Sequence, residues 1–200
     1  MSEQTAGRKI VTNIALSLDG HYARSADPRD MGWVMPYAVT DVARDHLTSL
    51  WEPATTALLG RVNAEGFLGF WPTVIGMEGA DPRDEGFAKW LVDAEKVVLS
   101  STLDEAPWER TTIENRPTAE VAAELKAGEG GDILVLASAS VIKALLAADL
   151  VDRLAVTVFP VFLGRGPRLF DDGLPEGQWT LASQAAGEHG TLSLVYDRVR

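Results

Sequence analysis

The sequence contains no cysteine at all. Without thiols, the chain cannot form disulfides, use a cysteine nucleophile, hold an iron–sulfur cluster or bind zinc through sulfur. Histidine is almost as scarce, because His21, His46 and His189 are the only three and show no HxH or HxxxH spacing. We therefore expect three surface histidines and no metal site.

Long apolar runs are missing too, since no stretch approaches the roughly 18 residues of a membrane-spanning helix. The first residues, MSEQTAGRK, are polar and lack the apolar centre of a signal peptide. Positive charge is in short supply: 18 Lys and Arg stand against 29 Asp and Glu, a net charge of −11 that argues against a nucleic-acid-binding face. We expect a cytoplasmic protein with small-molecule ligands and no membrane or nucleic-acid partner.

Segments with strand character and segments with helix character alternate along most of the chain. Apolar runs predict strands at 9–20, 55–59, 96–103, 132–138 and 153–164. Helical spacing predicts helices at 41–50, after Gly60, and at 87–92, 118–126 and 141–150, with an open loop at 73–86. The segments 179–184 and 191–198 read as a terminal hairpin.

This order of elements predicts an α/β fold. The central sheet is expected to be mainly parallel, with helices on both faces and an antiparallel C-terminal hairpin. No internal repeat and no linker interrupts the pattern. Residues 1–200 are therefore predicted to form a single domain, with a core from about residue 8 to residue 199.

Small and hydroxyl residues gather where the predicted strands end, at 17–20, 60–61, 100–102 and 137–140. Ligands of open α/β sheets bind beyond the carboxyl ends of the strands, and helix starts there attract phosphate groups. Gly60 and Arg61 stand at such a strand-to-helix corner, where a glycine lets a ligand approach the backbone. The alternative is that Gly60 is only a tight turn and Arg61 a solvated side chain. Four such ends on one edge favour a cleft for a long ligand such as a dinucleotide.

Several common catalytic and phosphate-binding motifs are missing from the sequence. Neither GxGxxG, GxxxxGK[ST] nor GxSxG occurs, and GRGPRLF cannot replace the first because Pro167 lies where a helix would begin. Chemistry without a metal or a protein nucleophile fits a cofactor-dependent reaction, in which the protein supplies position and electrostatics.

Five motifs together resemble a known family. They are NIALSLDG, DPRDMGW, LLGRVNAEGFLGFWP, KVVLSSTL and DILVLASASVIKALLAADLVDRLAVTVFPVFLGRGPRLF, spread in family order over residues 10–170. The set resembles the dihydrofolate reductase superfamily, and specifically the reductase domain of bacterial riboflavin biosynthesis with its stand-alone relatives. The resemblance implies a dihydrofolate-reductase-like fold, a homodimer, and a nicotinamide cofactor, normally NADPH, lying across the strand ends.

The resemblance also implies which residues form the site. It places Ala15 and Leu16 beside the nicotinamide, and Asp19 and Trp33 toward the substrate. Asp19 is equally suited to a turn, and the less favoured alternative for Trp33 is an aromatic core. No catalytic side chain stands out, so the proton is expected to come from water. The cofactor's phosphates, adenosine half and pyrophosphate would contact Gly60, Arg61 and Asn63, then Ser100, Ser101 and Thr102, then Ala137, Ser138, Ala139, Ser140, Val141 and Ile142.

Three positions depart from the family pattern: Asn63 replaces a threonine, Ser101 an arginine and Ala137 a glycine. The change at Ser101 removes a charge partner for a 2′-phosphate, so NADH is not excluded. The expected function is NADPH-dependent reduction of a small heterocyclic or carbonyl compound, resembling 5-amino-6-(5-phosphoribosylamino)uracil reductase. Alternatives are a non-catalytic nucleotide-binding dimer that kept the fold, and a true dihydrofolate reductase, against which Ala38 stands in place of the pterin-binding carboxylate.

Overall fold

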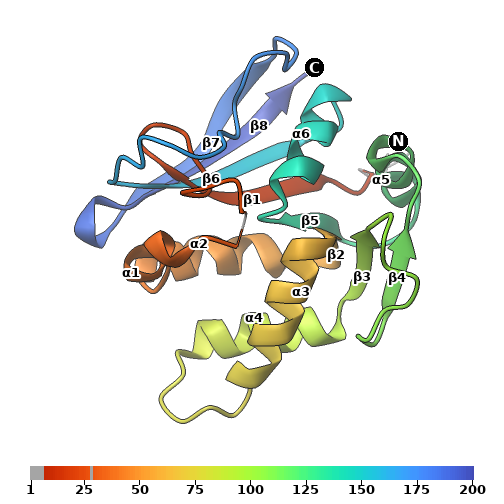
Figure 1. Ribbon diagram of the computed structural model, residues 1–200, viewed down its shortest axis with the longest axis horizontal. Helices are drawn as coiled ribbons and strands as arrows, with labels where there is room; N and C mark the ends of the chain where they lie inside the picture. The colour runs from red at the N-terminus through yellow and green to blue at the C-terminus, as the bar shows by residue number, and fades with distance from the viewer. Residues whose placement is uncertain (1–6, 28) are drawn as a thin grey trace, which may run out of the picture.

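An eight-stranded sheet forms the centre of the protein, and the computed structural model describes residues 7–27 and 29–200 (Figure 1). The strand order is β4-β3-β2-β5-β1-β6-β8-β7. Neighbouring strands from β4 to β6 are parallel, whereas β8 is antiparallel to both β6 and β7. The prediction of a mainly parallel sheet with an antiparallel C-terminal hairpin is confirmed. The strands are β1 (Ile10–Ser17), β2 (Ala54–Gly60), β3 (Glu95–Leu99), β4 (Thr111–Glu114), β5 (Asp132–Leu136), β6 (Arg153–Phe159), β7 (Gln178–Ala186) and β8 (Leu192–Val199).

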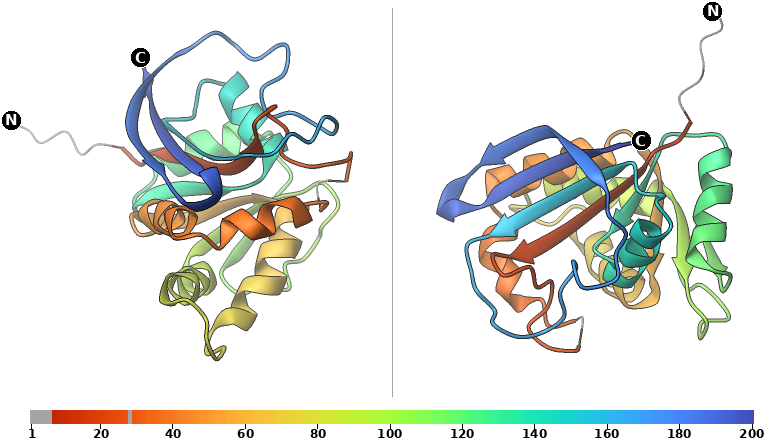
Figure 2. Two further views of the ribbon diagram at one scale, coloured as in Figure 1. Left: turned by 90° about the vertical axis from the view of Figure 1, so that its left-hand side faces the viewer. Right: turned by 90° about the horizontal axis from the view of Figure 1, so that it is seen from above.

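Helices cover both faces of this sheet (Figures 1 and 2). Along β5, Ile133 and Val135 belong to the core under α5 and α6, whereas Leu134 and Leu136 belong to the core under α2, α3 and α4. A strand buried on both faces reads as a continuous apolar run, which is why DILVL has no polar alternation. The helices are α1 (Met35–Ala38), α2 (Asp41–Trp51), α3 (Arg61–Phe70), α4 (Pro82–Asp93), α5 (Thr118–Ala127) and α6 (Ala139–Ala147), with short 3₁₀ turns at Gly32–Val34, Trp71–Val74 and Glu188–Gly190.

The largest differences between predicted and observed strands lie at three places. β4 was not predicted, because this edge strand has only four residues and is too short to show a period. The strand predicted at 96–103 ends at Leu99, which leaves the residues at 100–102 in a loop. The strand predicted at 153–164 ends at Phe159, because Pro160 lacks the N–H group needed to continue the ladder.

The segment 73–86, predicted as an open loop, is a loop at 75–81, between the 3₁₀ turn Trp71–Val74 and the start of α4 at Pro82. Asp81 caps α4 by accepting the N–H of Arg83 at 2.9 Å, and Pro82 follows at the first helical position. The Arg83 guanidinium also donates to Asp41 at 2.5 Å and to Asp45 at 2.7 Å on α2. The loop prediction was therefore wrong for residues 82–86, because these long-range ion pairs hold the start of α4 against α2.

Two of the three histidines are buried, so the expectation of surface histidines was wrong for them. His21 is 5% exposed, and its Nε2 lies 3.5 Å from Asp19 Oδ2. His46 is 7% exposed on the inward side of α2, and burial lowers its pKa to about 4. Only His189 is exposed as expected.

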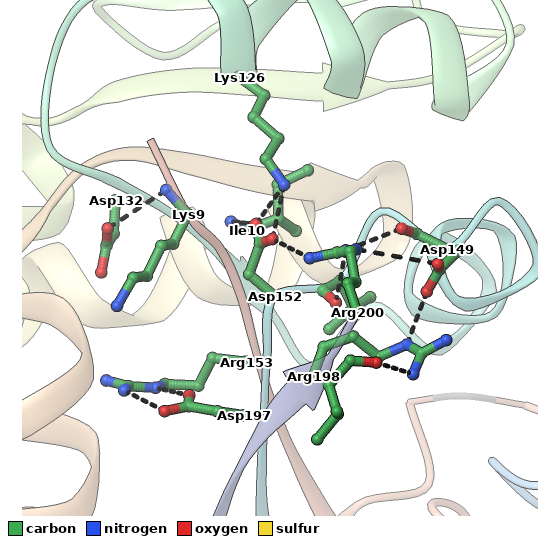
Figure 3. Close-up of polar contacts among 12 residues, drawn as sticks. Lys9, Ile10, Lys126, Asp132, Asp149, Asp152, Arg153, Asp197, Arg198 and Arg200 are labelled. Atoms are coloured by element: carbon green, nitrogen blue, oxygen red, sulfur yellow. Dashed lines mark hydrogen bonds and ion pairs between the residues drawn. The ribbon is translucent and has the colours of Figure 1, made fainter. Parts of the chain in front are cut away.

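Charged side chains hold the end of β8 against the segment that precedes β6, at the amino ends of the parallel strands (Figure 3). Arg200 donates to Asp152 at 2.7 Å and to the backbone carbonyl of Asp149 at 2.8 Å, and Arg198 donates to the Asp149 carboxylate at 2.7 Å. Lys126 at the end of α5 donates to both Asp152 oxygens, at 2.6 and 2.5 Å. Burial raises the pKa of Asp152, but these hydrogen bonds outweigh burial and hold it below its ordinary value. The network fixes the hairpin from one edge and leaves the carboxyl ends of the strands free for a site.

Candidate functional site

A cleft of about 440 Å³ runs along the carboxyl ends of β4, β3, β2, β5 and β1. Strands in a sheet are about 4.8 Å apart, so five neighbouring strand ends span about 19 Å. Nine of the predicted site residues line the cleft and seven do not. Those that line it are Gly60, Arg61, Asn63, Ser100, Ser101, Ala137, Ala139, Ser140 and Val141. Those that do not are Ala15, Leu16, Asp19, Trp33, Thr102, Ser138 and Ile142.

Two helices begin at the middle of the cleft without a side-chain cap. Gly60 precedes α3 and Ser138 precedes α6, and neither residue caps its own helix through a side chain. Among the helices of the described residues, α1, α2 and α5 lack a side-chain cap as well, and α4 is capped by Asp81. The first N–H groups of an uncapped helix lack intrahelical partners and carry a partial positive charge. Side by side, the starts of α3 and α6 are suited to binding the two phosphates of a pyrophosphate.

The hydroxyl of Ser138 joins these two helix starts instead of facing the cleft. Its Oγ accepts the backbone N–H of Gly60 at 2.9 Å and donates to the carbonyl of Leu136 at 2.9 Å. The residue is 1% exposed. Ser138 therefore positions the corner between β2 and α3, which the sequence could not reveal because a serine at this place can point either way.

The backbone at Ala137 is strained. This residue has a φ of 46°, a left-handed conformation that alanine adopts at a cost of about 1–2 kcal/mol. Its N–H group donates to the carbonyl of Asn13 on β1 at 2.8 Å, which holds the turn in place. The position is one where the resemblance expected glycine, and the conformation shows why glycine would be favoured there.

Gly60, in contrast, has an ordinary extended backbone with a φ of −80°. A Cβ added to it would meet Val141 Cγ2 at 3.5 Å and Ser138 Cβ at 3.8 Å, both ordinary contacts. The protein's own packing therefore does not require glycine here. Gly60 lines the cleft where α3 begins, so the absence of a side chain lets a ligand approach its backbone.

Arg61 is the first residue of α3 and lines the cleft with its side chain 40% exposed. Its guanidinium contacts Glu65 Oε1 at 2.9 Å, one helical turn away. Arg29 reaches the other oxygen of Glu65 at 3.2 Å but does not line the cleft. Arg61 is thus held near the helix start, where it adds positive charge to the unpaired N–H groups.

The loop after β3 is built around Ser100. Its Oγ accepts the N–H groups of Thr102 at 3.1 Å and of Leu103 at 3.0 Å. This turn leaves Ser101 exposed at the cleft, so a hydroxyl is available for a ligand. Thr102 lies beyond the lining.

Sequence reasoning missed the charged end of the cleft, where Glu114 ends β4 and Arg116 follows it. Arg116 donates to both oxygens of Glu114, at 2.8 and 2.7 Å. The guanidinium holds the pKa of Glu114 below its ordinary value. A strand predicted in front of Glu114 would have pointed to this end of the cleft, but β4 is too short to be recognised from the sequence.

Asp19 and Trp33, predicted to face the substrate, make contacts within the protein. Asp19 accepts the Ser17 hydroxyl at 2.6 Å and the backbone N–H groups of Leu163 at 3.1 Å and Gly164 at 2.7 Å. These bonds hold the pKa of Asp19 well below its ordinary range. Asp19 thereby ties the end of β1 to the segment after β6.

Trp33 is 3% exposed and lies edge-on to Phe159 with ring centroids 5.9 Å apart. Where the cleft reaches β1, its lining includes Ile14, Tyr22 and Met31. The apolar wall here therefore comes from residues that the sequence analysis did not single out.

Within residues 7–27 and 29–200, no group of three or more His, Asp or Glu side chains is arranged to hold a metal ion. No helix in that same part of the chain is both long and apolar enough to cross a membrane. The donors gathered at the cleft are backbone N–H groups, hydroxyls, an amide and guanidinium groups. This set is chemically suited to phosphate and ribose oxygens.

Comparison with known proteins gives consistent matches. The family model of the RibD C-terminal domain matches residues 8–192. The uncharacterized protein YyaP of Bacillus subtilis (strain 168) is 24% identical over 196 residues, which cover 98% of each chain.

Solved structures share the fold. A putative riboflavin biosynthesis protein from Shewanella sp. PV-4 has a TM-score of 0.69 and 22% identity, covering 96% of this chain and 99% of that one. The diaminohydroxyphosphoribosylaminopyrimidine deaminase/5-amino-6-(5-phosphoribosylamino)uracil reductase of Thermotoga maritima has a TM-score of 0.63 and 14% identity, covering 96% of this chain but 57% of that one. The predicted resemblance is confirmed: this chain belongs to the RibD C-terminal domain family and has its dihydrofolate-reductase-like fold.

Proposed function

We propose that this protein is a reductase that uses a reduced nicotinamide dinucleotide, in the cytoplasm, on a small heterocyclic or carbonyl compound. The observation that carries the proposal is the pair of uncapped helix starts, α3 and α6, in the middle of a cleft that spans five strand ends. Family membership supports a reductase related to the riboflavin pathway, and the resemblance makes NADPH the expected cofactor. The substrate then resembles that of 5-amino-6-(5-phosphoribosylamino)uracil reductase.

The cofactor would supply a hydride, and the chain's own residues would bind and orient it. The N–H groups that begin α3 and α6, with Arg61, would hold the pyrophosphate between them. Ile14, Tyr22 and Met31 would form the apolar wall that excludes water from the reacting end. The Ser138 hydroxyl, by accepting the N–H of Gly60, would hold the two helix starts in a fixed position relative to each other.

A titration of the purified protein with NADPH and NADH tests binding. Arg61→Ala should weaken dinucleotide binding by about tenfold or more, the scale of a lost charge-assisted hydrogen bond. Arg29→Ala is the matched control, because Arg29 shares Glu65 with Arg61 but does not line the cleft. If neither dinucleotide binds the wild-type protein, the proposed function is wrong.

Oxidation of the bound cofactor in the presence of carbonyl and pyrimidine compounds then tests turnover. Binding without oxidation by any member of the panel would favour the alternative, a nucleotide-binding protein that kept the fold. Dihydrofolate belongs in the panel as the third option, which Ala38 at the end of α1 disfavours because it offers no carboxylate.

We also propose that the protein is a homodimer. Phe162, in the segment after β6, is 76% exposed, and the edge strand β7 is exposed along almost its whole length. Large exposed apolar side chains and long unpaired strand edges are usually covered by a partner.

A further inference from the structure

The apolar end of the cleft contains a single side chain with a proton to give. Near β1 and the loop that follows it, the lining consists of Ile14, Tyr22, Ala26 and Met31, and of these only Tyr22 carries a hydroxyl. On the proposed function, on which this inference rests, hydride transfer takes place at this end, because the opposite end of the cleft carries charged residues. A carbonyl group that gains a hydride there also needs a proton for its oxygen.

The carboxyl groups nearest to the cleft are not suited to supply this proton. Glu114 lines the cleft at the end of β4, and the Arg116 guanidinium keeps the pKa of Glu114 below its ordinary value. Asp19 does not line the cleft, and the hydrogen bonds that it accepts from the Ser17 hydroxyl and from backbone N–H groups hold its pKa well below the ordinary range. Both groups are therefore ionised at neutral pH.

The histidine next to Tyr22 is buried outside the cleft lining. His21 is 5% exposed, and its Nε2 accepts a hydrogen bond from Arg168 Nε at 3.4 Å. His46 and His189 do not line the cleft either. No imidazole of the chain is thus in place to protonate a ligand in the cleft.

Tyr22 is held at its backbone and its ring, whereas its hydroxyl is accessible. Its N–H group donates to the carbonyl of Pro167 at 3.2 Å, next to the antiparallel bridge between His21 and Arg168. Its half-buried ring packs against the core under α6. Within residues 7–27 and 29–200, the hydroxyl makes no hydrogen bond and is not one of the buried polar atoms without a partner. A ligand in the cleft can therefore accept a hydrogen bond from it.

We propose that Tyr22 is the proton donor of this reductase, and that the substrate is a carbonyl compound that leaves as an alcohol. The carbonyl carbon takes the hydride that the reduced dinucleotide supplies, and the electrons of the C=O π bond move to the oxygen. That oxygen takes the proton of Tyr22 Oη, and a proton from solvent restores the phenol. The carbonyl compound is reduced and the dinucleotide is oxidised. Phenols keep their proton at neutral pH, and tyrosine is one of the side chains that act as general acids.

Steady-state kinetics with NADPH and a panel of aldehydes and ketones tests this assignment. Tyr22→Phe removes only the hydroxyl and should lower kcat by about 100-fold or more, the scale of a lost general acid. The Kd for NADPH should stay within about twofold of wild type, because the ring that packs against the core is kept. Thermal melting confirms that the variant is folded.

Tyr37→Phe is the matched control. Tyr37 stacks on Phe159 with ring centroids 5.0 Å apart and does not line the cleft. Its loss of a hydroxyl should leave kcat within about twofold of wild type.

NMR of the protein with ¹³C-labelled tyrosine side chains gives a readout that needs no turnover. The sequence has three tyrosines, Tyr22, Tyr37 and Tyr196, and the Tyr22→Phe spectrum identifies the Tyr22 signal by its absence. Saturating NADPH should shift the Tyr22 signal and leave the other two in place, because Tyr22 alone of the three lines the cleft.

A Tyr22→Phe protein that keeps kcat within about threefold of wild type would overturn the inference. So would a Tyr22 signal that a bound dinucleotide leaves unmoved, or a wild-type protein that binds the dinucleotide but reduces no carbonyl compound. In each of these cases a dinucleotide binds, so the dinucleotide site of the proposed function survives. Absence of binding by both NADPH and NADH would instead overturn the proposed function, and this inference with it.

Discussion

Ala137 is the clearest case in which one residue's backbone can be tested for strain. Its φ of 46° costs alanine more than glycine. Ala137→Gly should therefore raise the free energy of unfolding by about 1 kcal/mol, measured by denaturant titration. Dinucleotide affinity should stay equal or improve, because the turn keeps its shape. A destabilised variant would show that the added freedom of the unfolded glycine outweighs the relieved strain.

His46 makes stability depend on pH. Burial lowers its folded-state pKa to about 4, against an ordinary value of 6.5. Between these two pH values, His46 binds a proton in the unfolded chain but not in the folded chain. The free energy of unfolding therefore falls as pH drops from about 6.5 to about 4. The full loss across this window is about 3 kcal/mol from this residue.

His46→Gln should flatten the dependence of unfolding free energy on pH between these limits. His189→Gln, at an exposed position, is the control and should leave the slope as in wild type. An unchanged slope in His46→Gln would mean that His46 is protonated in the folded protein as readily as in the unfolded chain.

Single residues were the least predictable part of the site. The motif around Gly60 and Arg61 was sufficient to place both at the cleft. The sequence could not show that Ser138 turns its hydroxyl toward Gly60, nor that Trp33 is covered by Phe159, because both depend on neighbours far along the chain. A lone histidine on a helix likewise gives no signal of burial, since only packing decides which side faces the core.

At the scale of elements, the corner between β2 and α3 separates the needs of the fold from those of a ligand. A Cβ at Gly60 would make only ordinary contacts within the protein. Gly60→Ala should therefore melt close to wild type yet bind the dinucleotide about tenfold more weakly, because the methyl group would keep the ligand from the backbone at this corner. Thermal melting and calorimetric titration give the two readouts. Unchanged affinity would mean that no ligand approaches this backbone.

Helices and strands were predicted well where the apolar pattern runs over many residues. They were predicted poorly where contacts with distant parts of the chain determine the structure. The buried strand at 132–136 could be predicted because residues 133–136 are all apolar, and this local pattern is sufficient without knowledge of its neighbours. In contrast, β4 is only four residues long and the start of α4 depends on Arg83 reaching α2. Length and long-range charge pairing are the two properties that a local pattern does not contain.

At the scale of the whole molecule, Phe162 provides the test of the proposed homodimer. A dimeric mass in light scattering is expected for the wild type at micromolar concentration. Phe162→Asp should yield a monomer, because a charge at a covered apolar surface is costly to bury. Phe70→Asp is the control, since Phe70 is 53% exposed on α3. A monomeric wild type would contradict the dimer, and a dimeric Phe162→Asp would place its interface elsewhere.

The central claim is that a nicotinamide dinucleotide binds across the carboxyl ends of β4 to β1, with its pyrophosphate at the starts of α3 and α6. Hydrogen–deuterium exchange of the wild-type protein without ligand and with saturating NADPH or NADH tests it most directly. Exchange should slow at 61–63, at 139–141 and in the loop at 100–101, and should stay unchanged in the hairpin of β7 and β8. Slowed exchange confined to other segments, or no slowing with either NADPH or NADH at any concentration, would contradict the account.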